Sequence, residues 1–377
     1  MKKIFCVLIT VVMVITMMAG CGSSNNAAPA ASSQSQTDTQ GAAATTSEAP
    51  ASTVNPIPLK VGMMPSAVGA PVQYALENGY FKEEGVNIET VIFPSGAPIN
   101  EAIAAKELDL ACSGAATIFS LATGECKLIA DVEASGGMGI WVRPDSDIMK
   151  VKGKVPNHPE IYGSAETIKG KTFLASLGTA SQFNVLRYIE QFGLTDADVE
   201  IVHMEFGAAA QAFNAGEADA IATFAPYSSQ VEAEGAVKCT TFEDATESAL
   251  YDMCFARNAV IETRRDDLVK FMRAFNRAVE AMDNDSLRTE FSMKWFEKEG
   301  RKYSAETMAQ EIKDRPYVTK AVMSSSEYIF GKAMISYGKF NINIGKIEAE
   351  KLPYIEKCFD ASIIEEALAI KVVLPTK

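Results

Sequence analysis

The sequence predicts an α/β protein whose folded body consists of two similar lobes, each built around its own sheet. Short apolar segments alternate with helical segments of about ten residues, and this alternation is typical of parallel strands in βαβ units. The pattern then repeats: Ser66 and Ser176 lie 110 positions apart, and so do the segments AKELD at 105–109 and AGEAD at 215–219. The chain's 377 residues, 47% of them hydrophobic and 22% charged, suit a globular protein of about two domains.

The first lobe begins with an apolar strand at 59–63. The helix after it has Pro71 at its start and Gly79 just past its end, which are the positions that these two residue types favour. The elements expected next are a strand at 86–93, a helix through Ile99 and Ile103, a strand at 108–112 and a helix from Ala115 to Gly124.

The second lobe repeats this order. A strand at 172–175 leads through the loop 176–181 into a helix that ends at Phe192, and Gly193 follows as its C-terminal stop. Because the loops after the strands of both lobes precede helices, the two lobes should present similar loop edges.

Two segments are expected to connect the lobes. Residues 139–143 predict an outgoing strand, a polar insertion follows at 144–167, and residues 253–261 predict a return strand. Apolar residues at spacings of three and four from Leu268 to Met282 then predict an amphipathic helix that packs on a core. We therefore expect the first lobe to comprise 57–143 and 250–377, and the second lobe to comprise 144–249.

Residues 1–20 are organised like a secretory signal peptide, because Lys2 and Lys3 precede an apolar run that ends in the small pair Ala19-Gly20. Residues 18–21 resemble the lipobox of bacterial lipoproteins, in which the cysteine, here Cys21, is acylated and becomes the mature N-terminus. The stretch 22–56 has no aromatic residue and only two charged ones, so it cannot bury enough apolar surface to fold. We therefore expect a lipidated Cys21 and a disordered tether at 21–56.

Charge and motifs argue against several functions. The net charge is −13 and no Lys/Arg-rich block occurs, so we expect no nucleic-acid binding. The motifs of phosphate-binding loops, dinucleotide folds, metalloproteases and serine hydrolases are missing, and His158 and His203 are the only histidines. We therefore expect no catalytic residues, no cofactor and no metal.

The body contains an odd number of cysteines, so at least one of them should be free. They are Cys112, Cys126, Cys239, Cys254 and Cys358. No C-x-x-C pair is present and histidines are few, so a zinc site lacks ligands, and we expect buried free cysteines rather than a disulfide.

Several motifs in order resemble one family, the solute-binding lipoproteins of ABC importers, and in particular its nitrate, sulfonate, taurine and thiamine-pyrimidine group. The matching segments are ENGYFKEEGV at 77–86, AAKELD at 104–109, IKGK at 168–171, NAGEADA at 214–220, FAPY at 224–227 and FDAS at 359–362. The chain departs from the family pattern in its longer insertion at 144–167, in Phe224 where a Trp is common, and in Lys106 where a Gly is usual.

The resemblance implies a periplasmic-binding-protein-like type II fold, with two α/β lobes joined by two crossovers and a ligand cleft between them. It implies an extracytoplasmic, monomeric lipoprotein, held at the outer face of the bacterial cell membrane by Cys21. Such a protein captures a small polar or anionic organic solute, such as a sulfonate, nitrate, carboxylate or pyrimidine, and delivers it to the permease of an ABC importer. The alternatives are a lipoprotein that presents its solute to a receptor, or an enzyme related to the pyrimidine synthase of thiamine biosynthesis, whose Cys-rich iron-binding segment is missing here.

The candidate ligand-binding residues lie in the loops after the strands, because open α/β sheets bind ligands beyond their strand carboxyl ends. Backbone NH groups and hydroxyls at helix starts could hold an anionic head group there without Lys or Arg, although some of the hydroxyls could merely cap their helices. The loop candidates are Ser66, Ser95, Ser113, Gly114, Ala115, Gly178, Thr179 and Ser181. Three aromatic residues of the second lobe are candidates for the body of the ligand: Phe206, which could instead be core, Phe224 and Tyr227.

Overall fold

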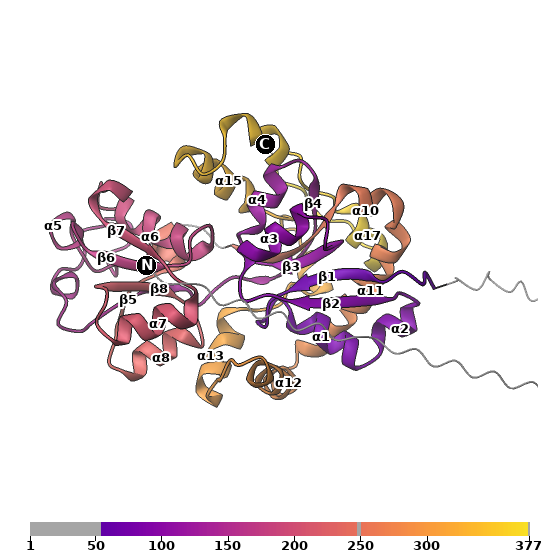
Figure 1. Ribbon diagram of the computed structural model, residues 1–377, viewed down its shortest axis with the longest axis horizontal. Coiled ribbons are helices and arrows are strands. Elements are labelled where there is room, and N and C mark those ends of the chain that lie inside the picture. Colours follow the sequence, from indigo (N-terminus) through magenta and orange to yellow (C-terminus); the bar gives the residue numbers. More distant parts are fainter. Residues whose placement is uncertain (1–53, 247–249, 376–377) are drawn as a thin grey trace, which may run out of the picture. The chain divides into compact units, whose positions relative to one another are not determined.

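The computed structural model describes residues 54–246 and 250–375, which form two five-stranded sheets (Figure 1). The expected signal peptide, Cys21 and all but the last three residues of the tether lie outside the described residues. Within the described ranges, no helix is both long enough and apolar enough to span a membrane.

The first sheet has the strand order β2-β1-β3-β10-β4. Its strands are β1 (Leu59–Met63), β2 (Ile88–Ile92), β3 (Leu110–Ser113), β4 (Cys126–Ala134) and β10 (Tyr251–Arg257). Strand β1 pairs in parallel with β2 and β3, whereas β10 lies antiparallel between β3 and β4. Helices α3 (Gly96–Ala104) and α4 (Thr117–Ala122) lie on one face, and α1 (Ala70–Glu77) and α11 (Arg265–Met282) lie on the other (Figure 1).

The second sheet has the equivalent order β7-β6-β8-β5-β9. Its strands are β5 (Gly139–Val142), β6 (Thr172–Ala175), β7 (Glu200–His203), β8 (Ala220–Thr223) and β9 (Val237–Thr241). Its helices are α5 (Ala165–Ile168), α6 (Ala180–Glu190), α7 (Phe206–Asn214), α8 (Tyr227–Ala233) and α9 (Phe242–Thr246). The fold class predicted from the sequence is confirmed, with β5 and β10 as the two antiparallel crossover strands.

The repeat seen in the sequence is a structural repeat. Helices α3 and α7 start 110 positions apart, at Gly96 and Phe206, and strands β3 and β8 start at Leu110 and Ala220. Asp109 and Asp219 also make equivalent hydrogen bonds. Their carboxylates accept from the backbone NH groups of Lys60 and Thr172, at the starts of β1 and β6.

Three details differ from the sequence-based expectation. Residues 139–142 were expected in the first lobe, but β5 pairs with β8 and β9 of the second sheet, because the crossover strand completes the lobe that it enters. The return strand ends at Arg257 rather than 261, where α10 (Asn258–Thr263) begins. The other lobe boundaries remain predictions.

The third difference concerns the cysteines, which were all expected to be free. Cys112 and Cys254 instead form a disulfide. The two residues are register partners on neighbouring antiparallel strands, β3 and β10, which brings their Cα atoms to 4.2 Å. The remaining body cysteines, Cys126, Cys239 and Cys358, are free and buried, as expected.

The second sheet separates two apolar clusters. Ile140 and Val142 point into one and Trp141 into the other, because neighbouring side chains of a strand face opposite sides. Trp141 is buried, and its indole NH donates to Glu232 Oε1 at 2.7 Å. The larger cluster of the first lobe includes the apolar face of α11, which packs on α1, on α2 (Tyr80–Glu84) and on α17 (Ser362–Leu368).

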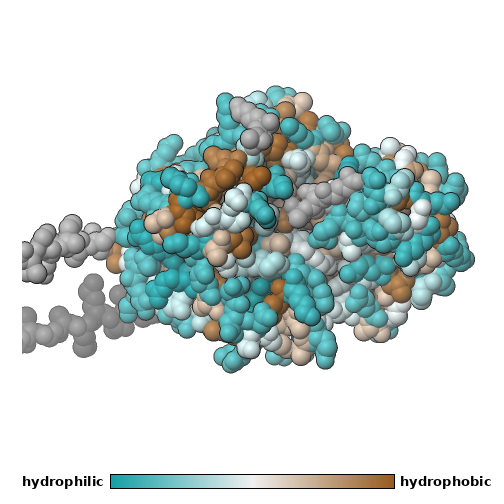
Figure 2. Space-filling model, turned by 180° about the vertical axis from the view of Figure 1, so that it is seen from behind, coloured by the Kyte–Doolittle hydropathy of each residue, from teal (hydrophilic) through white to brown (hydrophobic). Residues whose placement is uncertain are grey.

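The rest of the chain after α11 is mostly helical. Its helices are α12 (Asp285–Lys298), α13 (Ala305–Asp314), α14 (Lys320–Met323), α15 (Met334–Asn343) and α16 (Leu352–Ile355). Ser304 caps α13 by accepting from the Thr307 NH at 3.1 Å, and α13 ends before Pro316. On the face seen in Figure 2 the surface is mostly hydrophilic, with a few apolar patches, the largest of them at the upper left.

Candidate ligand-binding cleft

A cavity of about 60 Å³ lies where loops of the two lobes meet. Loops after β1, β3 and β6 contribute to its wall, together with the start of β10 and the segment around α13. The lining residues are Met64, Ser66, Pro94, Ser95, Gly96, Gly114, Ala115, Ala116, Ser135, Met138, Thr179, Ala180, Phe206, Phe224, Asp252, Arg301 and Arg315.

Most of the residues predicted from the sequence come together at this cavity. Those that line it are Ser66, Ser95, Gly114, Ala115, Thr179, Phe206 and Phe224. Ser113, Gly178, Ser181 and Tyr227 do not line it. The rule that ligand loops follow the strand carboxyl ends therefore located the cavity, but not each residue on its wall.

Three of the predicted hydroxyls already have protein partners, namely those of Ser95, Thr179 and Ser181. Thr179 caps α6: its Oγ1 accepts from the Ser181 NH at 3.2 Å and donates to the Ser176 carbonyl at 2.7 Å. Ser181 Oγ donates to the Ala222 carbonyl at 2.7 Å. The capping explanation therefore fits Thr179, and Ser181 ties α6 to β8.

Two other predicted hydroxyls have no partner. The Oγ atoms of Ser66 and Ser113 are buried and make no hydrogen bond to any described residue. The hydroxyls of Ser176 and Thr223, which occupy the equivalent positions 110 residues later, are buried and without a partner too. An unsatisfied buried polar group costs about 1–3 kcal/mol, and of these four residues only Ser66 lines the cavity, so its hydroxyl is available to a ligand that enters the cleft.

Contacts between the two lobes close the cleft. Ser95 Oγ donates to Glu205 Oε1 at 3.3 Å, and these residues precede the equivalent helices α3 and α7. Tyr303 OH donates to the Ala225 carbonyl at 3.1 Å. Thr307 Oγ1, on α13, donates to Ser229 Oγ on α8 at 3.0 Å. The segment from 301 to 315 thus joins the first lobe to the second.

Three charged residues on the wall, Asp252, Arg301 and Arg315, were not predicted. Arg301 is 7% exposed; its Nη2 donates to the Pro94 carbonyl at 3.1 Å, and its Nη1 has no partner among the described residues. Arg315 Nη2 donates to Glu133 Oε1 at 2.7 Å and to Asp252 Oδ2. No local pattern marks these residues, because they lie on β10 and beside α13, far along the chain from the loops they meet.

Burial shifts the titration of the acids behind this wall. It raises the pKa of Glu133 to about 8, although the neighbouring Arg315 opposes the shift. Burial also raises the pKa of Glu311 on α13. Removing a carboxylate from water disfavours its charged form, which is the cause in both cases.

The aromatic residues form one cluster, of which only a part reaches the cavity. Phe206 and Phe224 line it and pack edge to face, with ring centroids 4.7 Å apart. Tyr227 stacks behind Phe206 at 6.1 Å, and the Arg301 guanidinium lies 5.8 Å from the centre of its ring. Phe206, which could have been core, is both 8% exposed and part of the wall.

A larger hollow of about 700 Å³ lies elsewhere, between α6 and α15. Its wall includes Phe183, Arg187, Tyr337 and Phe340, and none of the residues predicted from the sequence. Size alone would favour this hollow, but its wall lacks the convergent strand-end loops and the unpartnered buried donors of the smaller cavity.

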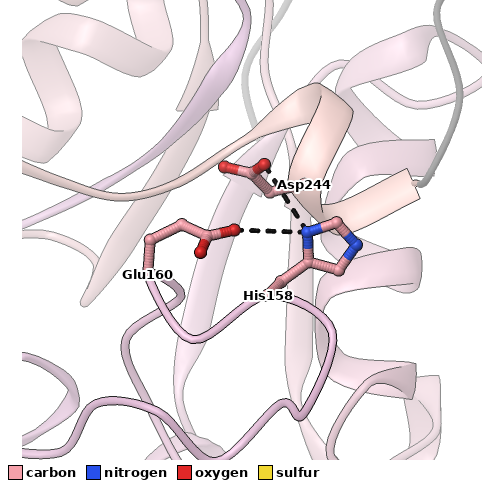
Figure 3. A group of neighbouring side chains, drawn as sticks. All are labelled: His158, Glu160 and Asp244. Atoms are coloured by element: carbon pink, nitrogen blue, oxygen red, sulfur yellow. Dashed lines mark hydrogen bonds and ion pairs between the residues drawn. The ribbon is translucent and has the colours of Figure 1, made fainter.

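A group of potential metal ligands lies apart from both hollows. Glu160 and Asp244 point toward the ring of His158, with their oxygens 3.2 and 3.6 Å from its Nδ1 (Figure 3). The sequence-based argument against a metal did not foresee this group, because Asp244 comes from α9 and the other two residues from the insertion. These contacts of the His158 ring with the two carboxylates link the insertion to α9.

Comparisons with known proteins agree with this architecture. The model of the NMT1-like family matches residues 52–295. An ABC transporter periplasmic binding protein of Brachyspira hyodysenteriae is 32% identical over 312 residues, which cover 82% of this chain and 89% of that protein. An aliphatic sulfonates-binding protein of Bacillus subtilis is 26% identical over 231 residues, covering 59% of this chain and 64% of that protein.

Solved structures share the fold at low identity. The alkanesulfonate-binding protein SsuA of Xanthomonas axonopodis, bound to MOPS, superposes with a TM-score of 0.61 at 17% identity and covers 81% of this chain and 98% of its own. The nitrate-binding protein NrtA of Synechocystis gives a TM-score of 0.64 at 14% identity, covering 82% and 88%. These are periplasmic binding proteins of the type II fold, as predicted, and by its sequence the chain belongs to the NMT1-like family.

Proposed function

We propose that this protein is the extracytoplasmic solute receptor of an ABC importer, and that it holds a small organic anion in the cleft. The observation that carries this function is the cavity itself, which is walled by both lobes and bordered by buried donors without partners. The family relatives, named as binding proteins of ABC transporters and of aliphatic sulfonates, support the same class of function and give no support to an enzyme.

The donors around the cavity favour an anion. Arg301 brings a positive charge and an unsatisfied NH to the wall, and Ser66 brings an unsatisfied hydroxyl. A hydrogen bond to a charged group is worth about 1.5–3 kcal/mol, more than one between neutral groups. The sequence-based expectation that neutral donors suffice therefore gives way to a proposal in which Arg301 holds the anionic group and Phe206 and Phe224 contact the body of the solute.

The choice of sulfonates as the first class of anion to test rests on solved proteins that share this fold. Two of them are named as binding an alkanesulfonate and nitrate, and both ligands spread a negative charge over several oxygens. We extend this class to the present chain, with sulfonates first and carboxylates, nitrate and pyrimidines as the other members of a test panel.

Thermal unfolding with that panel tests the function. A ligand that binds the folded protein raises its melting temperature, and at one hundred times its Kd it adds about 2.7 kcal/mol of stability. We expect one chemical class to raise the melting temperature and to bind with a stoichiometry of one by calorimetry. If every class leaves the melting temperature unchanged, the protein is not a receptor for small anions, and presentation to a protein partner becomes the better account.

We also propose that acylated Cys21 anchors a monomeric protein at the outer face of the cell membrane, beside the importer's permease. The support is the apolar run that ends in Ala19-Gly20 and the tether that follows Cys21. A palmitate analogue fed to expressing cells should label the wild type and not Cys21→Ala. Equal labelling of the two would contradict the anchor.

A further inference from the structure

We propose that an anionic solute binds in the cleft only when the carboxyl group of Glu133 carries a proton, so that in mildly alkaline solution the solute enters together with one proton. The inference rests on the proposed function, because it concerns the charge of the solute that the same cleft holds. It follows from how the charged groups behind the cavity wall are arranged.

Glu133 lies directly behind the wall. Strands β4 and β10 pair Glu133 with Asp252, which lines the cavity, and Arg315 Nη2 donates to both carboxylates. Glu133 is fully buried, and Asp252 and Arg315 are 3% and 6% exposed. A charge placed against Asp252 and Arg315 therefore acts on Glu133 with little screening by water.

Further charged and titratable groups surround this pair. From α12, Arg288 Nη2 lies 3.7 Å from Glu133 Oε2, and its guanidinium lies 3.9 Å from the ring centre of Tyr317. The backbones of Tyr317 and Glu133 pair in an isolated antiparallel β-bridge. From α13 comes Glu311, which is 4% exposed and has an Oε2 without a partner among the described residues.

When the carboxyl group of Glu133 is ionised, the buried charges balance before any solute binds. Glu133, Asp252 and Glu311 supply three carboxylates, and Arg288, Arg301 and Arg315 supply three guanidinium groups, all of them buried. An incoming anion that pairs with Arg301 leaves the cluster with one net negative charge, and an uncompensated buried charge is costly. Protonation of one carboxylate removes that cost.

Glu133 is the carboxyl group best placed to be protonated. Burial already raises its pKa to about 8, and its Oε2 makes no hydrogen bond to a described residue. A bound anion raises this pKa further, and by linkage the proton strengthens binding of the anion to the same extent. Affinity should therefore be constant below the pKa of the unliganded protein and should fall as the pH rises above it.

Calorimetric titration with ethanesulfonate tests the coupling. For a pKa of about 8 in the free protein, one linked proton makes the Kd about tenfold weaker at pH 9 than at pH 7. At pH 8.5, titrations in two buffers of different ionisation enthalpy should give different binding heats. The difference should equal the difference in ionisation enthalpy multiplied by the number of protons taken up, which is at most one. Glu133→Gln, which mimics the protonated acid, should bind with a Kd that no longer depends on pH.

The matched control is Asp131→Asn. Asp131 is buried on the same strand but bonds to Tyr328 and Gly331 and does not line the cavity, so this variant should keep the tenfold dependence. A wild-type Kd that is equal at pH 7 and pH 9, with no buffer-dependent heat, would overturn the inference and leave the receptor function intact. This outcome is measured on the wild type alone, so it does not depend on whether the variants fold. Absence of ethanesulfonate binding at every pH would overturn the sulfonate-first function, and with it this coupling.

Discussion

Replacing Arg301 by methionine should weaken solute binding far more than it weakens the fold. The variant Arg301→Met keeps most of the side-chain volume but removes the guanidinium group at the cavity wall. In the folded protein that group donates one hydrogen bond, to the Pro94 carbonyl, and leaves Nη1 unsatisfied.

The two effects differ in size for a physical reason. A lost hydrogen bond to a charged group costs about 1.5–3 kcal/mol of stability, but Arg301 forms no ion pair with the described residues, so relieving its desolvation offsets part of this loss. In the complex, the same change leaves the buried anion without its positively charged partner. Truncation of one partner of such a pair costs about 2–5 kcal/mol of binding free energy. With 1.4 kcal/mol for each factor of ten, the Kd should rise about 30- to 4,000-fold.

Calorimetry with ethanesulfonate at pH 7 measures the Kd, and urea unfolding measures the stability of the same samples. The matched control is Arg257→Met, since Arg257 is paired with Asp109 at 2.8 Å and does not line the cavity. The control should lose stability and keep its affinity. If Arg301→Met binds within threefold of the wild type, Arg301 does not hold the anion and the reasoning is refuted.

The remaining predictions concern the frame of the cleft. The double variant Cys112→Ala/Cys254→Ala should lose about 2–4 kcal/mol in urea unfolding, because the disulfide closes a loop of 142 residues, and a loss below 1 kcal/mol would show that the bond does not form. Thr179→Ala should cost about 1 kcal/mol of stability but little affinity, since its hydroxyl is used within the protein; the opposite result in paired unfolding and calorimetry would make it a ligand residue. Glu133→Gln should gain melting temperature relative to the wild type as the pH rises from 5 to 8. In the wild type Glu133 stays protonated in the folded state up to about pH 8 but ionises in the unfolded state at lower pH, so the wild type loses stability over this range, whereas the glutamine variant does not. A difference in melting temperature that stays constant from pH 5 to pH 8 would contradict this prediction.

The fold could be predicted because its signals are local. Alternating apolar and helical segments define the βαβ units, and the offset between Ser66 and Ser176 reflects a true repeat of the two sheets. The end of α13 at Asp314 follows from Pro316, and the cap at Ser304 follows from its residue type.

The chemistry of the cleft could be predicted only in part, because it depends on strand register and on distant segments. The loops around Ser66 and Gly114 follow strands whose ends meet at one edge, so sequence reasoning found them. Arg301 arrives from beyond α12, and no pattern around it distinguishes it from a surface arginine. Cys112 and Cys254 pair because β10 lies beside β3 in one register, which their spacing does not reveal.

The central claim is that a small organic anion binds in the cavity between the lobes. Crystals of the protein grown with 2-bromoethanesulfonate would locate the anion directly through the anomalous scattering of bromine. The account predicts one strong peak in the cavity lined by Ser66, Gly114, Phe224 and Arg301, with the sulfonate against the arginine. A peak in the larger hollow beside α6 and α15, with the cavity between the lobes empty, would contradict it.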